Sequence, residues 1–390
     1  MIKQIAIASF VALLSTASLA QQGPVKIGFL STFSGGASSV GNEMRDGFEL
    51  ALDHLGRKMG GRDVVVVYED DLVKPDIGRQ KTEKMLQSDR VDFLTGFAWS
   101  NVLLASLKSA IDAETFIISA NAGPSKIAGE LCSPWFFSTS WQGDQVPQAI
   151  GSFMNEKGVR SVYLLAPNYA AGKDVLSGLK ATFKGKVLGE DYTRWPDQLD
   201  FSAELSKARS AKPDAIFAFY PGGSWVQFLT QYAQTGLRGK TPLYTAFVID
   251  ELSLPRMNEL VVGIPGADHW VNDLPNDANR KFVADFRKQY GRKPSAYAAR
   301  SYDTTMLINS AVKASDGDLS RKDAMRDAMR KADFPSVRGP FRYGNNHFPI
   351  QNFYLQEVVK TDDGSFGLKT VGLASKDHQD RYHEKCSMKW

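Results

Sequence analysis

Three short loops rich in serine, glycine and asparagine carry residue types that could bind a small anion. Residues 31–36 include Ser34, residues 96–101 include Ser100, and residues 119–124 include Asn121. Each loop follows an apolar run of strand length, and the first two lead into helical patterns. Free backbone N–H groups and the helix dipole favour a negative group at such helix N-termini. The loops therefore predict a site for a negatively charged group, with ordinary β–α turns and a helix-capping Ser100 as the alternative.

The segments around these loops alternate between strand-like and helix-like patterns. Strands are expected near residues 25–30, 63–69, 91–95 and 115–119, with helices near 40–57, 75–88 and 100–112 between them. In the first helix, apolar residues recur three and four positions apart, as in a helix that buries one face. This alternation is typical of βαβ units around a parallel sheet.

A second run of similar design follows, after a short extended segment at residues 133–140. Helices near 144–157, 171–183 and 223–235 alternate with strands near 163–166, 187–193, 215–219 and 242–247. Three further helices are expected at 276–290, 296–314 and 321–331. Gly344, Asn345 and Asn346 then predict the turn of a hairpin whose long apolar partner is residues 352–359. Two α/β runs in succession predict an α/β protein with two domains.

Residues 1–20 have the features of a secretory leader, with a single lysine, a short apolar core and the small residues Ser18 and Ala20. We expect cleavage after Ala20 and a soluble, exported protein, because no later stretch reaches the ~18–20 apolar residues of a membrane span. Removing 20 of the 390 residues leaves 370. That length exceeds one ordinary core and again favours two domains.

Charge and cysteine content narrow the possible partners. The net charge is +4 with the charges interspersed, which argues against a nucleic-acid partner. The two cysteines, Cys132 and Cys386, are expected to form a disulfide because exported proteins meet an oxidising compartment. Two unpaired thiols are the alternative.

The sequence carries no catalytic signature that we recognise. The five histidines lack zinc-type spacing, and no nucleophile elbow, Walker A loop or dinucleotide fingerprint follows a strand. We therefore expect a protein that is not an enzyme and that uses no cofactor and no metal.

The chain resembles the leucine/isoleucine/valine-binding family, whose members are solute-binding proteins of ABC importers. The resemblance lies in a Ser-Gly loop, a glycine-spaced helix and a strand that ends in acidic residues before a proline, namely Ser34, Gly35, Gly41, Gly47, Ala51, residues 64–71 and Pro75. Beyond these motifs, the order and spacing of the helices and strands also resemble the family, to about residue 360. The resemblance implies two Rossmann-like lobes with parallel central sheets, joined by three hinge crossings near residues 139–143, 270–273 and 348–351. Residues 24–141 with 272–349 would form the N-terminal lobe, and 142–271 with 350–390 the C-terminal lobe.

The resemblance also implies a location, partners and a site. The protein would be a periplasmic monomer that holds a small carboxylate between its lobes and delivers it to the membrane permease of an ABC importer. In the family, a serine hydroxyl and backbone N–H groups of the second and third loops clamp the ligand carboxylate. The matching positions are Ser100, Ala120 and Ala122, with Asn121 between the last two.

Aromatic residues stand at equivalent points after several strands. Tyr169 lies where the family places a tyrosine over the ligand, and Tyr220 and Phe247 follow two further strands. With Phe97 and Trp99 they predict a flat apolar slot suited to an aromatic ring, the alternative being rim packing. His269, near the second crossing, is a further candidate contact, with a structural role as its alternative.

One departure from the family bears on the ligand. Amino-acid-binding members keep an acidic residue close to the position of Phe247, whereas the nearest acid here is Asp250. Burying an ammonium without a carboxylate partner is costly. We therefore expect an aromatic acid of the phenylpropenoid or benzoate type. The alternatives are a branched-chain amino-acid or amide binding protein in which Asp250 reaches the ammonium, and a periplasmic sensor subunit that signals to a membrane receptor.

Overall fold

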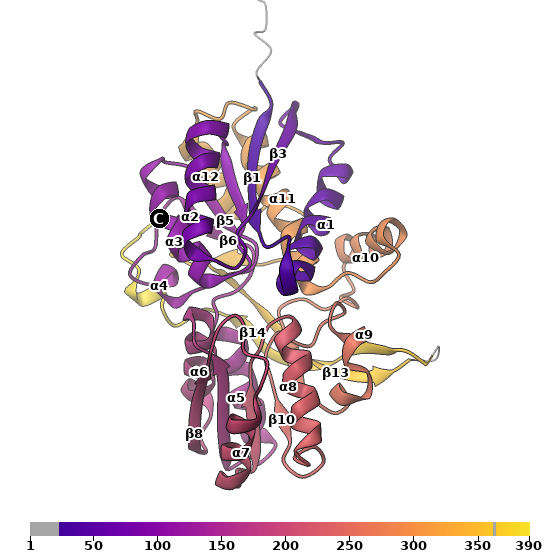
Figure 1. Ribbon diagram of the computed structural model, residues 1–390. Coiled ribbons are helices and arrows are strands. Elements are labelled where there is room, and N and C mark those ends of the chain that lie inside the picture. The colour runs from indigo at the N-terminus through magenta and orange to yellow at the C-terminus, as the bar shows by residue number, and fades with distance from the viewer. Residues whose placement is uncertain (1–22, 362–363) are drawn as a thin grey trace, which may run out of the picture.

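The computed structural model describes residues 23–361 and 364–390 and has two α/β lobes, one above the other in Figure 1. The expected cleavage site after Ala20 lies outside the described residues. Within these residues, none of the helices has the length and apolar character needed to cross a bilayer.

The first lobe is built on a six-stranded sheet. Its strands, in spatial order, are β2 (Lys58–Met59), β3 (Arg62–Asp70), β1 (Val25–Ser31), β4 (Phe93–Gly96), β5 (Phe116–Ser119) and β6 (Phe136–Ser138). All neighbours pair in parallel except β2 and β3. The central strands β4 and β5 are buried along their whole length, as is typical of parallel strands covered on both faces.

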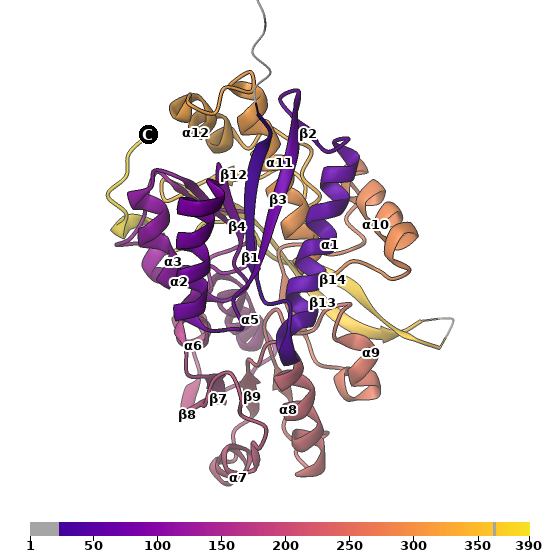
Figure 2. The ribbon, with the colours of Figure 1, turned by 45° about the horizontal axis from the view of Figure 1, so that its top comes forward.

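Helices from both ends of the chain complete this lobe (Figure 2). The early helices are α1 (Ser38–His54), α2 (Pro75–Lys84), α3 (Ser100–Asp112) and α4 (Ser125–Ala128), with a 3₁₀ turn η1 (Gly35–Ala37) and a π turn η2 (Met85–Asp89). The late helices are α10 (Asp277–Tyr290), α11 (Ala296–Ala314) and α12 (Lys322–Lys331). A Cβ at Gly47 would lie 2.1 Å from the carbonyl oxygen of Ala298, so this glycine lets α1 and α11 pack in close contact.

The second lobe has a four-stranded parallel sheet in the order β10 (Leu243–Tyr244), β9 (Ala215–Ala218), β7 (Ser161–Pro167) and β8 (Lys186–Thr193). Its helices are α5 (Gln145–Glu156), α6 (Ala170–Thr182), α7 (Ser202–Ala211), α8 (Gly223–Gln234) and α9 (Leu254–Met257), followed by the turn η3 (Asn258–Val261). The α/β class and the parallel sheets predicted from the sequence are confirmed. Helix α7 escaped prediction because only Leu205 and Ala208 of it are buried, which leaves a weak apolar pattern.

A third sheet contains β11 (Gly266–Asp268), β13 (Pro349–Lys360), β12 (Arg342–Tyr343) and β14 (Phe366–His378). The predicted hairpin exists only as the two-residue pairing of β12 with β13. The main partner of β13 is instead β14, which the sequence analysis missed because many of its side chains are exposed or only half-buried. This long β13–β14 hairpin projects from the side of the molecule in Figure 1.

Two large apolar clusters correspond to the two lobes. One joins buried residues of 25–137 with residues of 297–348, and the other joins residues of 141–267 with Phe353 and Val358. We propose lobe boundaries close to the three expected crossings. Arg338 links two of those crossings, since it donates to Gln351 Oε1 (2.7 Å) and to the Ser140 carbonyl (3.3 Å).

The end of the chain departs from the expected lobe assignment. After β14 the tail, with the turn η4 (His383–Lys385), returns to the first lobe, where a disulfide joins Cys386 to Cys132. The Asn346 amide also donates to Asp380 Oδ2 (2.9 Å). Residues 379–390 therefore do not belong to the second lobe alone. They bridge the lobes, because Arg381 forms an ion pair with Asp144 at 2.5 Å.

Candidate ligand-binding site

A cavity lies between the lobes, at the carboxyl ends of strands from both sheets. Loops after β4 and β5, the first crossing and the start of α11 line it on one side, and loops after β7, β9 and β10 on the other. The lining residues are Ala98, Trp99, Ser100, Asn121, Ala122, Trp141, Tyr169, Ala171, Phe219, Pro221, Phe247 and Tyr297. None of these twelve carries a formal charge at neutral pH. The open volume is about 30 Å³, enough for a water molecule or two but not for an aromatic ring. Binding of a larger ligand therefore requires the lobes or the lining side chains to move apart.

Ser100 is the first residue of α3, and the residue that caps the helix is Trp99. The predicted capping role of Ser100 is therefore wrong: the cap makes no side-chain hydrogen bond. Among the described residues the Ser100 hydroxyl has no hydrogen-bond partner, although the side chain is buried. Its hydroxyl is left available at a helix N-terminus, where an anion is favoured.

A second helix N-terminus faces the same cavity from the other lobe. Tyr169 caps α6, and both Tyr169 and Ala171 line the cavity. The partial positive charges at the starts of α3 and α6 therefore act on one small space. This convergence supports the anion site predicted from the loops.

The third loop shapes the cavity without offering the expected backbone donors. The Ala120 N–H donates to the Gly96 carbonyl and the Ala122 N–H to the Phe97 carbonyl, both at 3.0 Å. These bonds hold the second and third loops together and leave neither N–H for a ligand. The donor role expected for Ala120 and Ala122 is thus corrected. Asn121 does line the cavity, and its amide donates to the Ala98 carbonyl at 2.8 Å.

The first loop, residues 31–36, lies at the outer edge of the space between the lobes. Ser34 is exposed and lines an outer pocket with Trp195 and Leu199, not the inner cavity. The N–H of Phe33 donates to Asp70 Oδ1 at 3.1 Å, so a carboxylate of the protein itself already accepts a hydrogen bond from this loop. An anion site at residues 31–36 is therefore not supported.

Aromatic rings form most of the inner walls. Phe247 stacks on Trp141 with ring centroids 4.3 Å apart and meets Phe219 edge-on at 5.8 Å. Tyr169 stacks on Trp195 at 4.5 Å. The expected slot for a flat ring thus has Tyr169, Phe247 and Trp99 in its walls, together with Trp141, Phe219 and Tyr297, which the sequence analysis had not singled out as contacts.

Trp99 and Trp195 approach each other across the lobes, with ring centroids 5.4 Å apart. Trp99 is held in place because its indole N–H donates to the Thr32 hydroxyl at 2.7 Å, and Thr32 in turn donates to Asp71. Trp195 packs against the apolar clusters of both lobes. Trp99 therefore lines the cavity, whereas Trp195 lines the outer pocket and backs the ring of Tyr169.

Two predicted aromatic contacts are not brought to the cavity. Tyr220 lies in the core of the second lobe, 4.7 Å from the Phe201 ring and 5.0 Å from the Phe228 ring. Phe97 is likewise buried in the core of the first lobe. Consecutive residues of an extended chain point to opposite sides, so Phe219 reaches the cavity and Tyr220 does not.

His269 also lies away from the cavity. It directly follows β11 and is buried, and its Nδ1 is 2.7 Å from Asp268 Oδ1. Burial, reinforced by the nearby Arg338 charge, lowers the pKa of His269 to about 3, so the imidazole is neutral at physiological pH. The structure gives it a role in the polar core near the second crossing.

A buried cation behind the cavity was missed. Arg300 of α11 is 1% exposed and pairs with Asp268 Oδ2 at 2.7 Å. It donates to Asn121, and its guanidinium carbon lies 5.1 Å from the ring centres of both Trp141 and Tyr297. Its positive charge is therefore directly behind three lining residues. An arginine within a helix sequence of mainly apolar and hydroxyl-bearing residues was the signal that could have found it.

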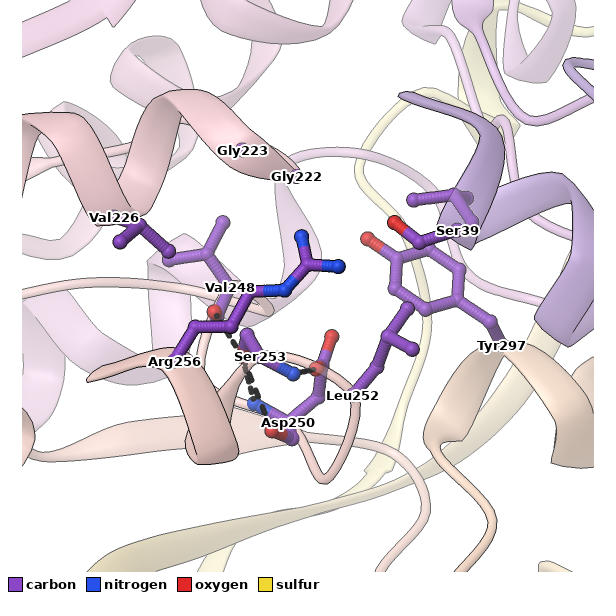
Figure 3. A pocket seen from close by; sticks show the side chains of 11 residues that line it. Ser39, Gly222, Gly223, Val226, Val248, Asp250, Leu252, Ser253, Arg256 and Tyr297 are labelled. Carbon is purple, nitrogen blue, oxygen red and sulfur yellow. Dashed lines mark hydrogen bonds between the residues drawn. The ribbon is translucent and has the colours of Figure 1, made fainter. Parts of the chain in front are cut away.

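Asp250 lies next to the cavity rather than in it. It lines a second small pocket (Figure 3), and Tyr297 is the residue that lines both spaces. Asp250 Oδ1 accepts from the Ser253 N–H at 2.8 Å, and burial raises the pKa of Asp250 to about 6. In the part of the chain that the structure describes, no cluster of three or more His, Cys, Asp or Glu side chains could hold a metal ion.

Comparison with known proteins assigns the chain to a family. It matches the family described as "Periplasmic binding protein" over residues 24–364. It is 27% identical to the Leu/Ile/Val-binding protein homolog 6 of Brucella melitensis biotype 1 over 387 residues, which cover 96% of this chain and 97% of that one.

Two solved structures of ABC-transporter solute-binding proteins are also similar. One, from R. palustris in complex with benzoate, is 33% identical with a TM-score of 0.88 and covers 94% of this chain and 100% of its own. The other, from Rhodopseudomonas palustris BisB5 in complex with 3,4-dihydroxybenzoic acid, is 27% identical with a TM-score of 0.84 and covers 92% and 99%. The two lobes, the cavity between them and these matches show that the chain belongs to the periplasmic binding protein family, the extracytoplasmic solute-binding proteins of ABC transporters.

Proposed function

We propose that this protein captures an aromatic carboxylate of the benzoate or phenylpropenoid type between its lobes and delivers it to the permease of an ABC importer. The observation that carries the proposal is the make-up of the cavity. Aromatic rings form its walls, a free serine hydroxyl and two helix N-termini lie at its edge, and no acidic side chain lines it. A ring with one carboxylate has the matching chemistry. The benzoate and dihydroxybenzoate bound by the two similar structures add support.

Binding of a branched-chain amino acid is the second candidate. It is favoured by the name of the Brucella relative and by Asp250, which lies beside the cavity. An ammonium in the aromatic cavity itself would have no carboxylate partner, and such burial is costly. The amino acid would therefore have to reach past Tyr297.

A thermal-shift screen separates the two candidates. A ligand at about 100 times its Kd stabilises the folded protein by about 2.7 kcal/mol. We expect benzoate or cinnamate to raise the melting temperature, and leucine, isoleucine and valine to leave it unchanged. A shift with leucine and none with any aromatic acid would reject the proposal.

Replacing Ser100 with alanine should weaken benzoate binding by about 1.5–3 kcal/mol, the range for a hydrogen bond to a charged group. Isothermal calorimetry measures this change in Kd. Ser109→Ala, in the last turn of the same helix, is the matched control and should bind as the wild type does. An unchanged Kd for Ser100→Ala would remove this hydroxyl from the site.

Phe247→Glu should abolish most aromatic-acid binding, because it places an unpaired carboxylate against the bound ring. We expect a loss of at least about 1–3 kcal/mol. Phe247→Gln is the control, because glutamine has the shape of glutamate without its charge. The difference in affinity between the two variants measures the electrostatic part of the loss. Equal affinity in Phe247→Glu and wild type, by calorimetry on variants with native circular dichroism, would show that Phe247 does not contact the ligand.

A further inference from the structure

The pocket beside Tyr297 contains two oppositely charged side chains that are not paired with each other. We propose that it receives the distal hydroxyl of a hydroxylated aromatic acid, which would donate to Asp250 and accept from Arg256. This inference rests on the proposed function and narrows its substrate class. The ring would lie in the aromatic cavity with its carboxylate at Ser100, and the hydroxyl would extend past Tyr297.

Asp250 is the acceptor in this pocket. The residue is buried, with 7% of its surface exposed. One oxygen accepts from the Ser253 N–H, whereas the other has no hydrogen-bond partner among the described residues. Figure 3 shows the carboxylate turned toward the space in front of Tyr297. A carboxylate oxygen that faces a small enclosed pocket has little access to water, so a ligand donor at this point would be stabilising.

Arg256 is the donor. It lies on α9 at the rim, and its guanidinium points toward the hydroxyls of Tyr297 and Ser39 in Figure 3. Over the described residues it makes neither an ion pair nor a side-chain hydrogen bond, and Asp250 is beyond ion-pair distance. The space between the two charges can therefore admit a group that meets both.

A carboxylate and a guanidinium that face one space, as Asp250 and Arg256 do, favour a hydroxyl as the ligand group. A hydroxyl donates one hydrogen bond and accepts others, so it satisfies a carboxylate and a guanidinium together. An ammonium would be attracted by Asp250 but repelled by Arg256. A carboxylate would be attracted by Arg256 but repelled by Asp250. The starts of α1 and α8, which supply Ser39 and Gly223 to the pocket, add partial positive charge and further disfavour an ammonium.

Tyr297 fixes how the two spaces are joined. Its ring lines both of them, and its position at the start of α11 is held by Glu43 of α1, which accepts from the Ser295 N–H at 2.8 Å. A ligand that occupies both spaces must pass the edge of this ring. The class of ligand is therefore a flat acid with its hydroxyl opposite the carboxylate.

Calorimetry on the full mature chain tests the inference with two matched pairs, benzoate against 4-hydroxybenzoate and cinnamate against 4-hydroxycinnamate. In at least one pair we expect the hydroxylated acid to bind about tenfold tighter or more, as for a hydrogen bond to a charged group. Asp250→Asn and Arg256→Met should each remove most of that preference and leave the affinity for the unhydroxylated acid within about twofold. Arg160→Met, at an exposed arginine of the second lobe, is the matched control and should keep the preference.

The outcomes separate this inference from the proposed function. Equal affinities within both pairs, or a preference that survives in Arg256→Met and Asp250→Asn alike, would overturn the inference alone. If Asp250→Asn fails to fold, Arg256→Met decides, since its side chain is exposed. Binding of leucine that is lost in Asp250→Asn would make the pocket an ammonium site and overturn the inference. Failure of all four acids to bind would overturn the proposed function and the inference with it.

Discussion

Replacing Arg300 with methionine should lower the free energy of unfolding by about 3–5 kcal/mol, because it leaves Asp268 as an uncompensated buried charge. Burial opposes ionisation of Asp268, but the charge of Arg300 and the hydrogen bonds from His269 hold its pKa below the usual value. Removing the guanidinium removes the largest of these stabilising interactions. Urea unfolding of wild type and variant at neutral pH measures the difference.

The same variant should also weaken benzoate binding. The Arg300 side chain supports Asn121, Trp141 and Tyr297, and its charge favours an anion in front of them. The double variant Arg300→Met with Asp268→Asn is the control, since neutralising both partners should restore part of the stability but not the affinity. A single variant as stable as wild type would contradict the role given to this ion pair.

Cys132→Ser should lower the free energy of unfolding by about 2–4 kcal/mol, the usual range for a disulfide. The bond joins residues 254 positions apart, so reduction frees most of the unfolded chain. Because the bond lies outside the cavity, affinity for benzoate should stay close to wild type. Denaturant unfolding and calorimetry on the same preparations measure the two effects.

Cys386→Ser is the matched control for the disulfide and should match Cys132→Ser in both measurements. A thiol titration of the native wild-type protein should find no reactive cysteine, and denaturation with reduction should release two. Two titratable thiols in the native protein would contradict the bond, and an unchanged unfolding curve in either variant would contradict its contribution to stability.

The sequence was sufficient to predict the architecture and the position of the site at the ends of the parallel strands. Apolar strands followed by serine and glycine loops marked the carboxyl ends of parallel strands, where Ser100 and Trp99 lie. Alternation of strands and helices does not depend on long-range contacts, so it can be read locally. The expected resemblance to the leucine/isoleucine/valine-binding family is confirmed by the family match.

What could not be predicted depends on contacts between distant segments. The Ala120 and Ala122 N–H groups were expected to face the ligand, but the packing of one loop on its neighbour uses both. Tyr220 was predicted to contact the ligand, but the neighbouring Phe219 lines the cavity, because the end of β9 could not be predicted to within one residue. Arg300 lies on a helix whose sequence gives no single buried face, because nearly every side of it is covered.

The lobe assignment of the tail failed for a related reason. Order along the chain placed residues 379–390 with the strand before them, whereas the disulfide and the contacts of Asn346 return them to the first lobe. The expectation of a Cys132–Cys386 bond already implied this return, because the two cysteines had been assigned to different lobes.

The crystal structure of the protein grown with benzoate is the most direct test of an aromatic carboxylate site between the lobes. We expect the carboxylate within hydrogen-bond distance of the Ser100 hydroxyl and the first N–H groups of α3, with the ring against Tyr169 and Phe247. The lobes or lining side chains should stand further apart to make room for it, because the present cavity has only about 30 Å³ of open volume. A benzoate bound elsewhere, or a cavity that stays without benzoate at saturating concentration while leucine binds with its ammonium at Asp250, would contradict that site.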